Sequence, residues 1–136
     1  MVIYELIFTD NDVAFKLTVG SYNSSTDKRM KFGAVLLNKG HGYNMSTGLF
    51  TVLVPGLYTF TAQICSNQNT GLYISTNSYT IAYSPVYISN IGTCTTTTGV
   101  AILYTGDAVG VFISGTDNVP RDSSNQYTGY IIHRYG

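Results

Sequence analysis

Hydrophobic and polar positions alternate along most of this chain, most clearly near its beginning. Four apolar side chains there occupy every second position: Val13, Phe15, Leu17 and Val19. A period of two residues places such side chains on one face of a β-strand. The pattern therefore predicts a strand with one buried face over residues 13–19.

Further runs rich in β-branched and aromatic residues follow, at 32–37, 49–54, 57–65, 72–76, 79–83, 96–104, 108–114 and 127–135. Residues that preset a turn or tolerate positive φ separate them, namely Asn38-Lys39-Gly40, Pro55-Gly56, Asn77-Ser78 and Gly106-Asp107. Stretches of helix-favouring residues are absent. The pattern predicts an all-β sandwich or barrel of about ten antiparallel strands.

Length and composition narrow the class of protein. The chain has 136 residues, which suits one domain with a self-supporting core. Hydrophobic residues make up 44% of it and aromatic residues 13%, a composition that excludes intrinsic disorder. Seven basic residues balance seven acidic ones, so the chain lacks the positive field that drives nucleic-acid binding. We expect one domain without a nucleic-acid partner.

The first twelve residues are interpreted as a lead-in segment, either an added strand or a stem, and residues 13–136 as the domain. The apolar opening carries Glu5 and has no basic stretch before it, and no apolar run approaches the ~18 residues of a membrane helix. We expect neither a signal peptide nor membrane insertion in this sequence. Glycosylation sequons at Asn23 and Asn44 agree with a secreted, extracellular protein.

Groups suited to catalysis or metal binding are scarce. The two histidines, His41 and His133, and the scattered acidic residues form no catalytic or phosphate-binding motif. Asp10-Asn11-Asp12 resembles only the start of a calcium loop, because the glycine and glutamate that should follow are missing. We expect no enzymatic activity and no cofactor, and assign no metal site.

The most specific motif is a pair of spaced signatures in the first half of the chain. They read Gly40-x-x-Tyr43-Asn44-x-x-Thr47-Gly48-x-Phe50 and Val54-Pro55-Gly56-x-Tyr58-x-Phe60. Their residues and separation resemble the signature G-x-x-Y-[DN]-x-x-T-G-x-F and P-G-x-Y-x-F of the C1q domain family. Glycines suit awkward backbone positions and the rings suit the core, so the motif itself indicates a fold rather than a ligand.

Weaker matches extend the resemblance from Val13 onward. They are Val13-Ala14-Phe15, the segment Phe32 to Asn38, Gly106-Asp107-x-Val109 and Tyr127-x-Gly129-x-Ile131. Three positions depart from the family pattern: Gly33 stands where the family has Asp, Leu53 where it often has Pro, and Gly110 where it often has Trp. Local packing and ligand surfaces are expected to differ there.

The resemblance implies a jelly-roll β-sandwich of the C1q and tumour-necrosis-factor type, a homotrimer with threefold symmetry, and a role in recognition without catalysis. No collagen-like repeat precedes Val13, so the chain is most similar to the stalkless invertebrate defence lectins, some of which bind sialic acid.

The same topology bears on Cys65 and Cys94. It places the strand that ends at Cys65 antiparallel to the strand that begins after Cys94, so both thiols lie at one end of the sheet. Two cysteines in a secreted domain are more often joined than free. We expect a Cys65–Cys94 disulfide, with two reduced, buried cysteines as the alternative.

The segment 118–127 is the longest polar loop that the pattern predicts, and it supplies the candidate ligand contacts. Arg121 follows Pro120, whose fixed φ stiffens the backbone. A planar guanidinium can grip a sugar carboxylate with two parallel hydrogen bonds. The alternative is a solvated connection in which Arg121 pairs with Asp122 or Asp117.

Neighbouring side chains complete this candidate site: Ser123, Ser124 and Asn125 for sugar hydroxyl or acetamido groups, and Tyr127 for a stacking ring face. The leading functional hypothesis is a secreted, homotrimeric pattern-recognition lectin of innate immunity that binds acidic glycans such as sialosides on cell surfaces. The alternatives are a protein ligand for a receptor, of the tumour-necrosis-factor or adipokine type, and a structural trimerisation module.

Overall fold

The computed structural model describes residues 12–25, 29–66, 70–86 and 93–135, and they form eleven β-strands. The strands are β1 (Ala14–Asn23), β2 (Lys31–Lys39), β3 (Tyr43–Asn44), β4 (Leu49–Thr51), β5 (Gly56–Ser66), β6 (Thr70–Thr76), β7 (Thr80–Val86), β8 (Thr93–Leu103), β9 (Ala108–Ser114), β10 (Asn118–Asp122) and β11 (Gln126–Arg134). The predicted all-β class is confirmed. Within the described residues no helix is long and apolar enough to cross a membrane. The predicted lead-in lies almost wholly outside them.

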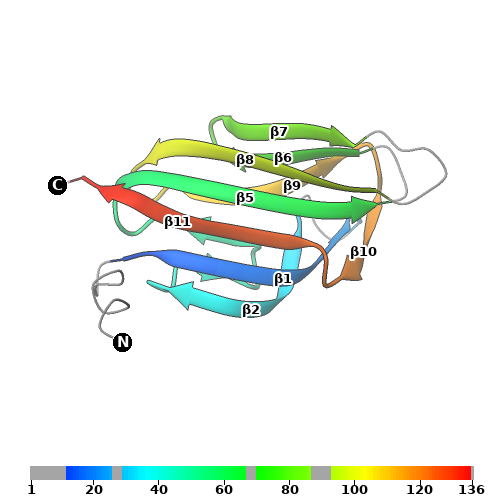
Figure 1. The fold of residues 1–136 in the computed structure, drawn as a ribbon, viewed down its shortest axis with the longest axis horizontal. Coiled ribbons are helices and arrows are strands. Elements are labelled where there is room, and N and C mark those ends of the chain that lie inside the picture. The colour runs from blue at the N-terminus through cyan, green and yellow to red at the C-terminus, as the bar shows by residue number, and fades with distance from the viewer. Residues whose placement is uncertain (1–11, 26–28, 67–69, 87–92, 136) are drawn as a thin grey trace.

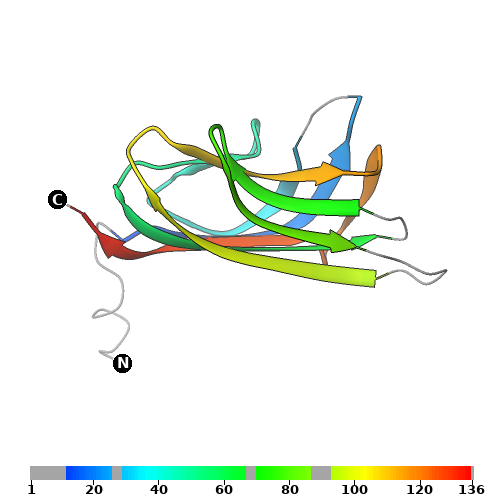
Figure 2. The same cartoon turned by 90° about the horizontal axis from the view of Figure 1, so that it is seen from above.

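Two antiparallel sheets pack face to face as a sandwich (Figures 1 and 2). Sheet A has the order β10-β1-β11-β5-β8, and β2 pairs with β1 as well; sheet B has the order β3-β4-β9-β6-β7. The longest ladder joins β5 and β8 from Gly56↔Leu103 to Ser66↔Thr93. Several neighbouring strands, such as β1 and β11 or β5 and β8, are far apart in sequence, so the fold depends on long-range pairing.

The core lies between the sheets and is rich in aromatic rings. Along β5 every second residue is buried, as period-two alternation requires. Phe15 lies at the centre, with its ring centroid 4.7 Å from that of Tyr127 and 5.0 Å from that of Phe50. Gly129 leaves room for this cluster, because a Cβ there would lie 2.6 Å from the Phe15 ring. The predicted core role of Phe50, Tyr58, Phe60 and Tyr43 is confirmed.

The first predicted strand departs from its pattern at Val19. Phe15 and Leu17 are buried, but Val19 is half-buried and has a φ of 59°, a rare value for a β-branched residue. The partner of β1 changes there, since residues 14–17 pair with β11 whereas the strand from Gly20 onward pairs with β10. Alternation therefore stops where β1 leaves one partner for the other.

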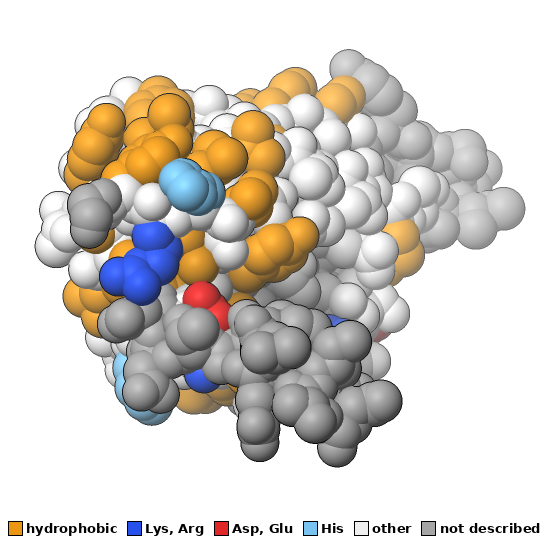
Figure 3. Space-filling view, turned by 60° about the vertical axis from the view of Figure 1, so that its left-hand side comes forward, with side chains coloured by type: hydrophobic (Ala, Val, Ile, Leu, Met, Phe, Trp, Pro, Cys, Tyr) orange, Lys and Arg blue, Asp and Glu red, His pale blue; other side chains and the backbone are white. Residues whose placement is uncertain are grey.

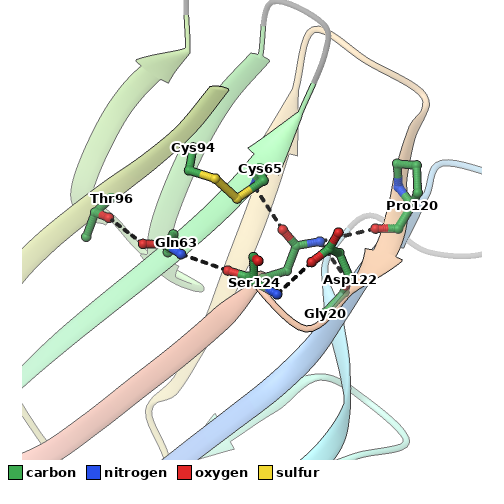
Figure 4. The surroundings of a disulfide bond; sticks show 9 residues. Gly20, Gln63, Cys65, Cys94, Thr96, Pro120, Asp122 and Ser124 are labelled. Atoms are coloured by element: carbon green, nitrogen blue, oxygen red, sulfur yellow. Dashed lines mark hydrogen bonds between the residues drawn. A yellow bond between two sulfur atoms is a disulfide. The ribbon is translucent and has the colours of Figure 1, made fainter. Parts of the chain in front are cut away.

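Cys65 and Cys94 face each other across β5 and β8 and form a disulfide, so the predicted pairing is confirmed (Figure 4). The bond joins the ends of the two strands, and the residues it links are separated by 29 positions. Tying these ends removes conformations from the unfolded chain, which stabilises the folded state.

Replacing both cysteines, as C65S/C94S, should lower the free energy of unfolding by about 3 to 4 kcal/mol, the loop-closure entropy of a bridge of this span. Urea unfolding of the variant and the parent measures the difference. Equal unfolding midpoints would show that the bridge contributes nothing to stability.

Three buried tyrosines make the fold sensitive to alkali. Burial raises the pKa of Tyr58 to about 12 and raises the pKa of Tyr127 well above its usual value, with nearby Tyr43 as a second cause. Burial also raises the pKa of Tyr43, against a smaller opposing effect of the hydrogen bond from the Phe32 amide. Folding therefore keeps these phenols protonated above the pH at which the unfolded chain loses its protons.

Stability should stay constant with respect to these groups below pH 10, the usual pKa of tyrosine, and fall as the pH rises from 10 through about 12. Each tyrosine contributes a slope of at most about 1.4 kcal/mol per pH unit, because the unfolded state binds fewer protons there. Urea unfolding across this range measures the slope, and Tyr58→Phe should reduce it. A free energy of unfolding that rises with pH in this window would contradict the assignment.

Candidate functional site

The segment expected to be a long polar loop is instead a strand, a tight turn and the start of a second strand. Residues 118–122 form β10, which pairs with β1 through Asn118↔Asn23 and Val119↔Tyr22. Val119 is fully buried and anchors this strand to the core. The loop prediction is wrong because one apolar side chain among polar neighbours suffices to dock an edge strand.

Asn125, expected to contact a ligand, is a buried structural residue. Its Oδ1 accepts a hydrogen bond of 2.8 Å from the Cys65 amide, and its Nδ2 donates to the carbonyls of Gly20, at 2.8 Å, and Pro120, at 3.1 Å (Figure 4). These bonds tie β5, β1 and β10 to the turn. The side chain has no exposed surface for a ligand, so its predicted binding role is corrected to a positioning one.

Tyr127 is likewise a core residue and not a surface ring. Its exposed fraction is 0%, and its ring lies against Phe15 and Phe32. The position follows from alternation along β11, in which Tyr127 and Gly129 face the core while Thr128 and Tyr130 face outward. Its predicted stacking on a sugar is corrected for that reason.

Arg121 is exposed on β10, and its side chain reaches across β1 to Gly33 on β2. The guanidinium Nη2 lies 3.2 Å from the point where a Cβ at Gly33 would sit. Gly20 of β1 lies between the two strands, since it pairs with Asp122 on one side and Phe32 on the other. The guanidinium therefore lies over the backbone of Gly33, and the absence of a side chain at position 33 leaves room for it.

Neighbouring carboxylates are engaged elsewhere. Asp122 Oδ1 accepts a 2.7 Å hydrogen bond from the Ser124 amide, and Asp117 Oδ1 accepts a 3.2 Å bond from the Ser24 hydroxyl. Among the described residues Arg121 forms no ion pair with either, in contrast to the alternative expected from the sequence. The guanidinium therefore keeps its donors directed to solvent.

The turn between β10 and β11 brings the predicted serines next to this arginine in the chain. Ser123 is exposed, and Ser124 is half-buried with its carbonyl accepting a 2.9 Å hydrogen bond from Gln63 Nε2. Arg121, Ser123 and Ser124 therefore lie close together along β10 and the turn after it, which Asn125 ties to β1 and β5, while the Arg121 guanidinium extends toward Gly33 on β2. The contact between Gly33 and Arg121 was not predicted from the sequence. The signal that could have indicated it was glycine at position 33, where the family pattern has Asp.

Metal-binding groups do not gather in the part of the chain that the structure describes. No group of three or more His, Cys, Asp or Glu side chains is found there. Asp10 and Asn11 of the incomplete calcium-loop pattern lie outside the described residues.

A second surface of interest is an apolar patch on the outer face of sheet A, near the end of β11. Its members are exposed hydrophobic residues: Val100, Ile102, Tyr104, Tyr130 and Ile132. Figure 3 shows hydrophobic side chains gathered over this end of the molecule. Beside the patch, a groove of about 550 Å³ is lined by residues that include Leu37, Tyr130 and Ile132. An exposed apolar area of this kind is typical of a protein–protein interface.

Comparison with known proteins places these features in a family. The C1q domain model matches residues 14–132. A curated relative, the heavy metal-binding protein HIP of Mytilus edulis, is 26% identical over 135 residues, which cover 93% of this chain and 63% of the relative. The chain thus spans less than two thirds of the length of that protein.

Solved structures agree on the fold. The globular domain of zebrafish complement 1qA matches with a TM-score of 0.69 and 21% identity, covering 92% of this chain and all of the other. Murine APRIL matches with a TM-score of 0.61 and 14% identity, covering 89% and 98%. The sandwich is therefore a jelly roll of the C1q and tumour-necrosis-factor type. With a family model that spans most of the sequence and a matching fold, the chain belongs to the C1q domain family.

Proposed function

We propose that this chain is the recognition domain of a secreted, homotrimeric lectin of innate immunity, and that Arg121 binds the carboxylate of acidic glycans such as sialosides. The observation that carries the proposal is the exposed guanidinium, held over Gly33 and without an ion pair among the described residues. C1q domain proteins are typically extracellular, which is where such glycans are displayed.

The chemistry of the site suits a carboxylate. A guanidinium presents two parallel N–H donors to the two oxygens, which an ammonium cannot match. Pairs on either side of Arg121, Val119↔Tyr22 and Asp122↔Gly20, and the fixed φ of Pro120 restrain its backbone, so little backbone freedom is lost when a ligand binds. Ser123 and Ser124 follow Arg121 in the turn between β10 and β11, and their hydroxyls would serve the sugar hydroxyls.

Assembly would supply the strength that one small site lacks. C1q and tumour-necrosis-factor domains commonly form trimers, and the apolar patch of sheet A offers a surface that a second copy would cover. Linking three weak sites raises the overall affinity without any new contact. The β10–β11 turn with the proposed glycan site lies at the other end of sheet A (Figure 1), near the disulfide (Figure 4), where it would remain accessible.

The alternatives differ in what they bind. A receptor ligand would bind independently of sugar, and the likeness to murine APRIL shows the fold alone. The name of the mussel relative suggests heavy-metal binding, but the described residues contain no cluster of metal-binding side chains to carry it over. Glycan binding that free sugar abolishes distinguishes the lectin from both.

The parent protein should sediment as a trimer of the 14.8 kDa chain at low micromolar concentration. Ile102→Asp should sediment as a monomer, because it puts a charge into the apolar patch at a site that tolerates exposure in the single chain. Analytical ultracentrifugation measures the mass, and circular dichroism checks that the variant is folded. A parent protein that stays monomeric would contradict the proposed assembly.

Arg121→Lys should weaken binding of a sialyl-terminated trisaccharide at least tenfold, about 1.4 kcal/mol, because lysine loses the paired donors. Arg134→Lys, a change at another exposed arginine, should leave binding unchanged. Gly33→Asp should also weaken binding, since its carboxylate would compete for the guanidinium. Isothermal titration calorimetry measures the constants. Parental affinity in a folded, trimeric Arg121→Lys would remove this residue as the anchor.

A further inference from the structure

A row of aromatic side chains crosses the outer face of sheet B. Tyr73 on β6 lies opposite Phe112 on β9 and, on its other side, opposite Tyr83 on β7. The three point outward, because their strand neighbours, such as Leu72 and Ile74, face the core. The ring centroids of Tyr73 and Tyr83 are 4.6 Å apart at 37°, and Tyr83 is 50% exposed. We call Phe112, Tyr73 and Tyr83 the aromatic row.

Two glycines let these rings lie over the sheet instead of standing upright. A Cβ at Gly71 would lie 3.1 Å from the Tyr73 ring and 3.2 Å from the Tyr83 ring. A Cβ at Gly110 would lie 3.3 Å from the Phe112 ring. Aromatic rings that cover glycines stabilise the strands that carry them, and Tyr83 is half exposed. The aromatic row therefore presents a low apolar platform.

Gly110 is one of the positions at which the chain departs from the family pattern, which often has Trp there. The smaller residue leaves the space that the Phe112 ring and Leu49 partly fill. The departure thus shapes the outer face of sheet B rather than the core.

The strands that carry the platform are uncharged and rich in hydroxyl groups, and one charged residue, Arg29, lies beside the row because it forms a β-bridge with Phe112. None of the three strands β6, β7 and β9 contains a charged residue. Ser75 Oγ hydrogen-bonds Thr80 Oγ1 at 3.2 Å, and Ser114 Oγ hydrogen-bonds the Tyr73 hydroxyl at 3.4 Å. A ligand over Tyr73 and Tyr83 would gain stacking and hydrogen bonds. Neither kind of contact requires a charge on the sugar.

We propose that the aromatic row is a second carbohydrate site, which binds neutral hexopyranosides by stacking the C–H face of the sugar on the exposed rings. Pyranoses with several C–H groups on one face, such as β-galactosides, match an electron-rich ring face with a rim of hydroxyls. The site lies on sheet B, whereas Arg121 and the apolar patch lie on sheet A (Figure 2). It goes beyond the proposed function and does not depend on it.

Methyl β-galactoside is the probe, because it is neutral and offers one ring. Titration followed by NMR should shift tyrosine and phenylalanine ring resonances of the parent protein. Tyr83→Ala should weaken binding at least about tenfold, as expected when one stacking ring is lost, whereas Tyr83→Phe should bind like the parent, because the ring face and not the hydroxyl makes the contact. Tyr79→Ala is the matched control, since Tyr79 is 49% exposed on the turn between β6 and β7.

Several outcomes would overturn the proposal. They are the absence of ring shifts up to the solubility limit of the sugar, parental affinity in Tyr83→Ala, and equal losses in Tyr83→Phe and Tyr83→Ala. A change of sedimenting mass in Tyr83→Ala would show that a second copy of the chain covers the row instead.

Arg121→Lys separates this proposal from the function proposed above. It should leave galactoside binding unchanged while it weakens sialoside binding. Loss of sialoside binding together with retained galactoside binding supports both sites. Galactoside binding in a parent protein that binds no sialoside would leave the aromatic row standing and the Arg121 site refuted.

Discussion

The packing of large aromatic rings between the two sheets is the constraint on which the rest of this structure depends. Phe15 and Phe60 on sheet A meet Phe50 on sheet B, with ring centroids 5.0 Å and 6.0 Å from it, and Tyr127 joins the cluster 4.7 Å from Phe15. Rings of this size separate the sheets and leave little tolerance for added atoms. Gly129 is required beside Phe15 for that reason.

The turn just before Tyr127 connects this core cluster to the surface. Asn125 lies in that turn, and its side chain makes three hydrogen bonds that connect β1, β5 and β10. The disulfide at Cys65 holds the same corner from the side of β8. Arg121 thus lies on a strand that Asn125 ties to β1 and β5, which is how a rigid scaffold holds a binding group in place.

The two outer faces of the sandwich carry different chemistry. Sheet A has the apolar patch at one end and Arg121 on β10 at the other. The strands β6, β7 and β9 of sheet B are uncharged, and their aromatic rings lie over glycines. Burying the patch against other copies of the chain would leave both Arg121 on β10 and the aromatic row accessible. Such a division lets one domain use one face for assembly and others for recognition.

Local patterns alone determined most of the strands, the turns and most of the core. Alternation at Phe15 and Leu17 and the ring spacing between Phe50 and Phe60 depend only on nearby residues, and the motif of glycines and rings indicated the family. The cysteine pairing also followed once the strand order was known from that family. These features could be predicted because a period of two residues specifies which side chains share a face.

Only the tertiary structure decided the candidate site. Asn125 and Tyr127 were expected to contact a ligand, and Val119 lay in the predicted loop, but the packing of β10 and β11 buries all three. The contact between Arg121 and Gly33 and the alignment of Phe112, Tyr73 and Tyr83 depend on strand order and register, which join residues remote in sequence. Local alternation contains no information on which strands become neighbours, so these surfaces follow from the fold and not from the pattern.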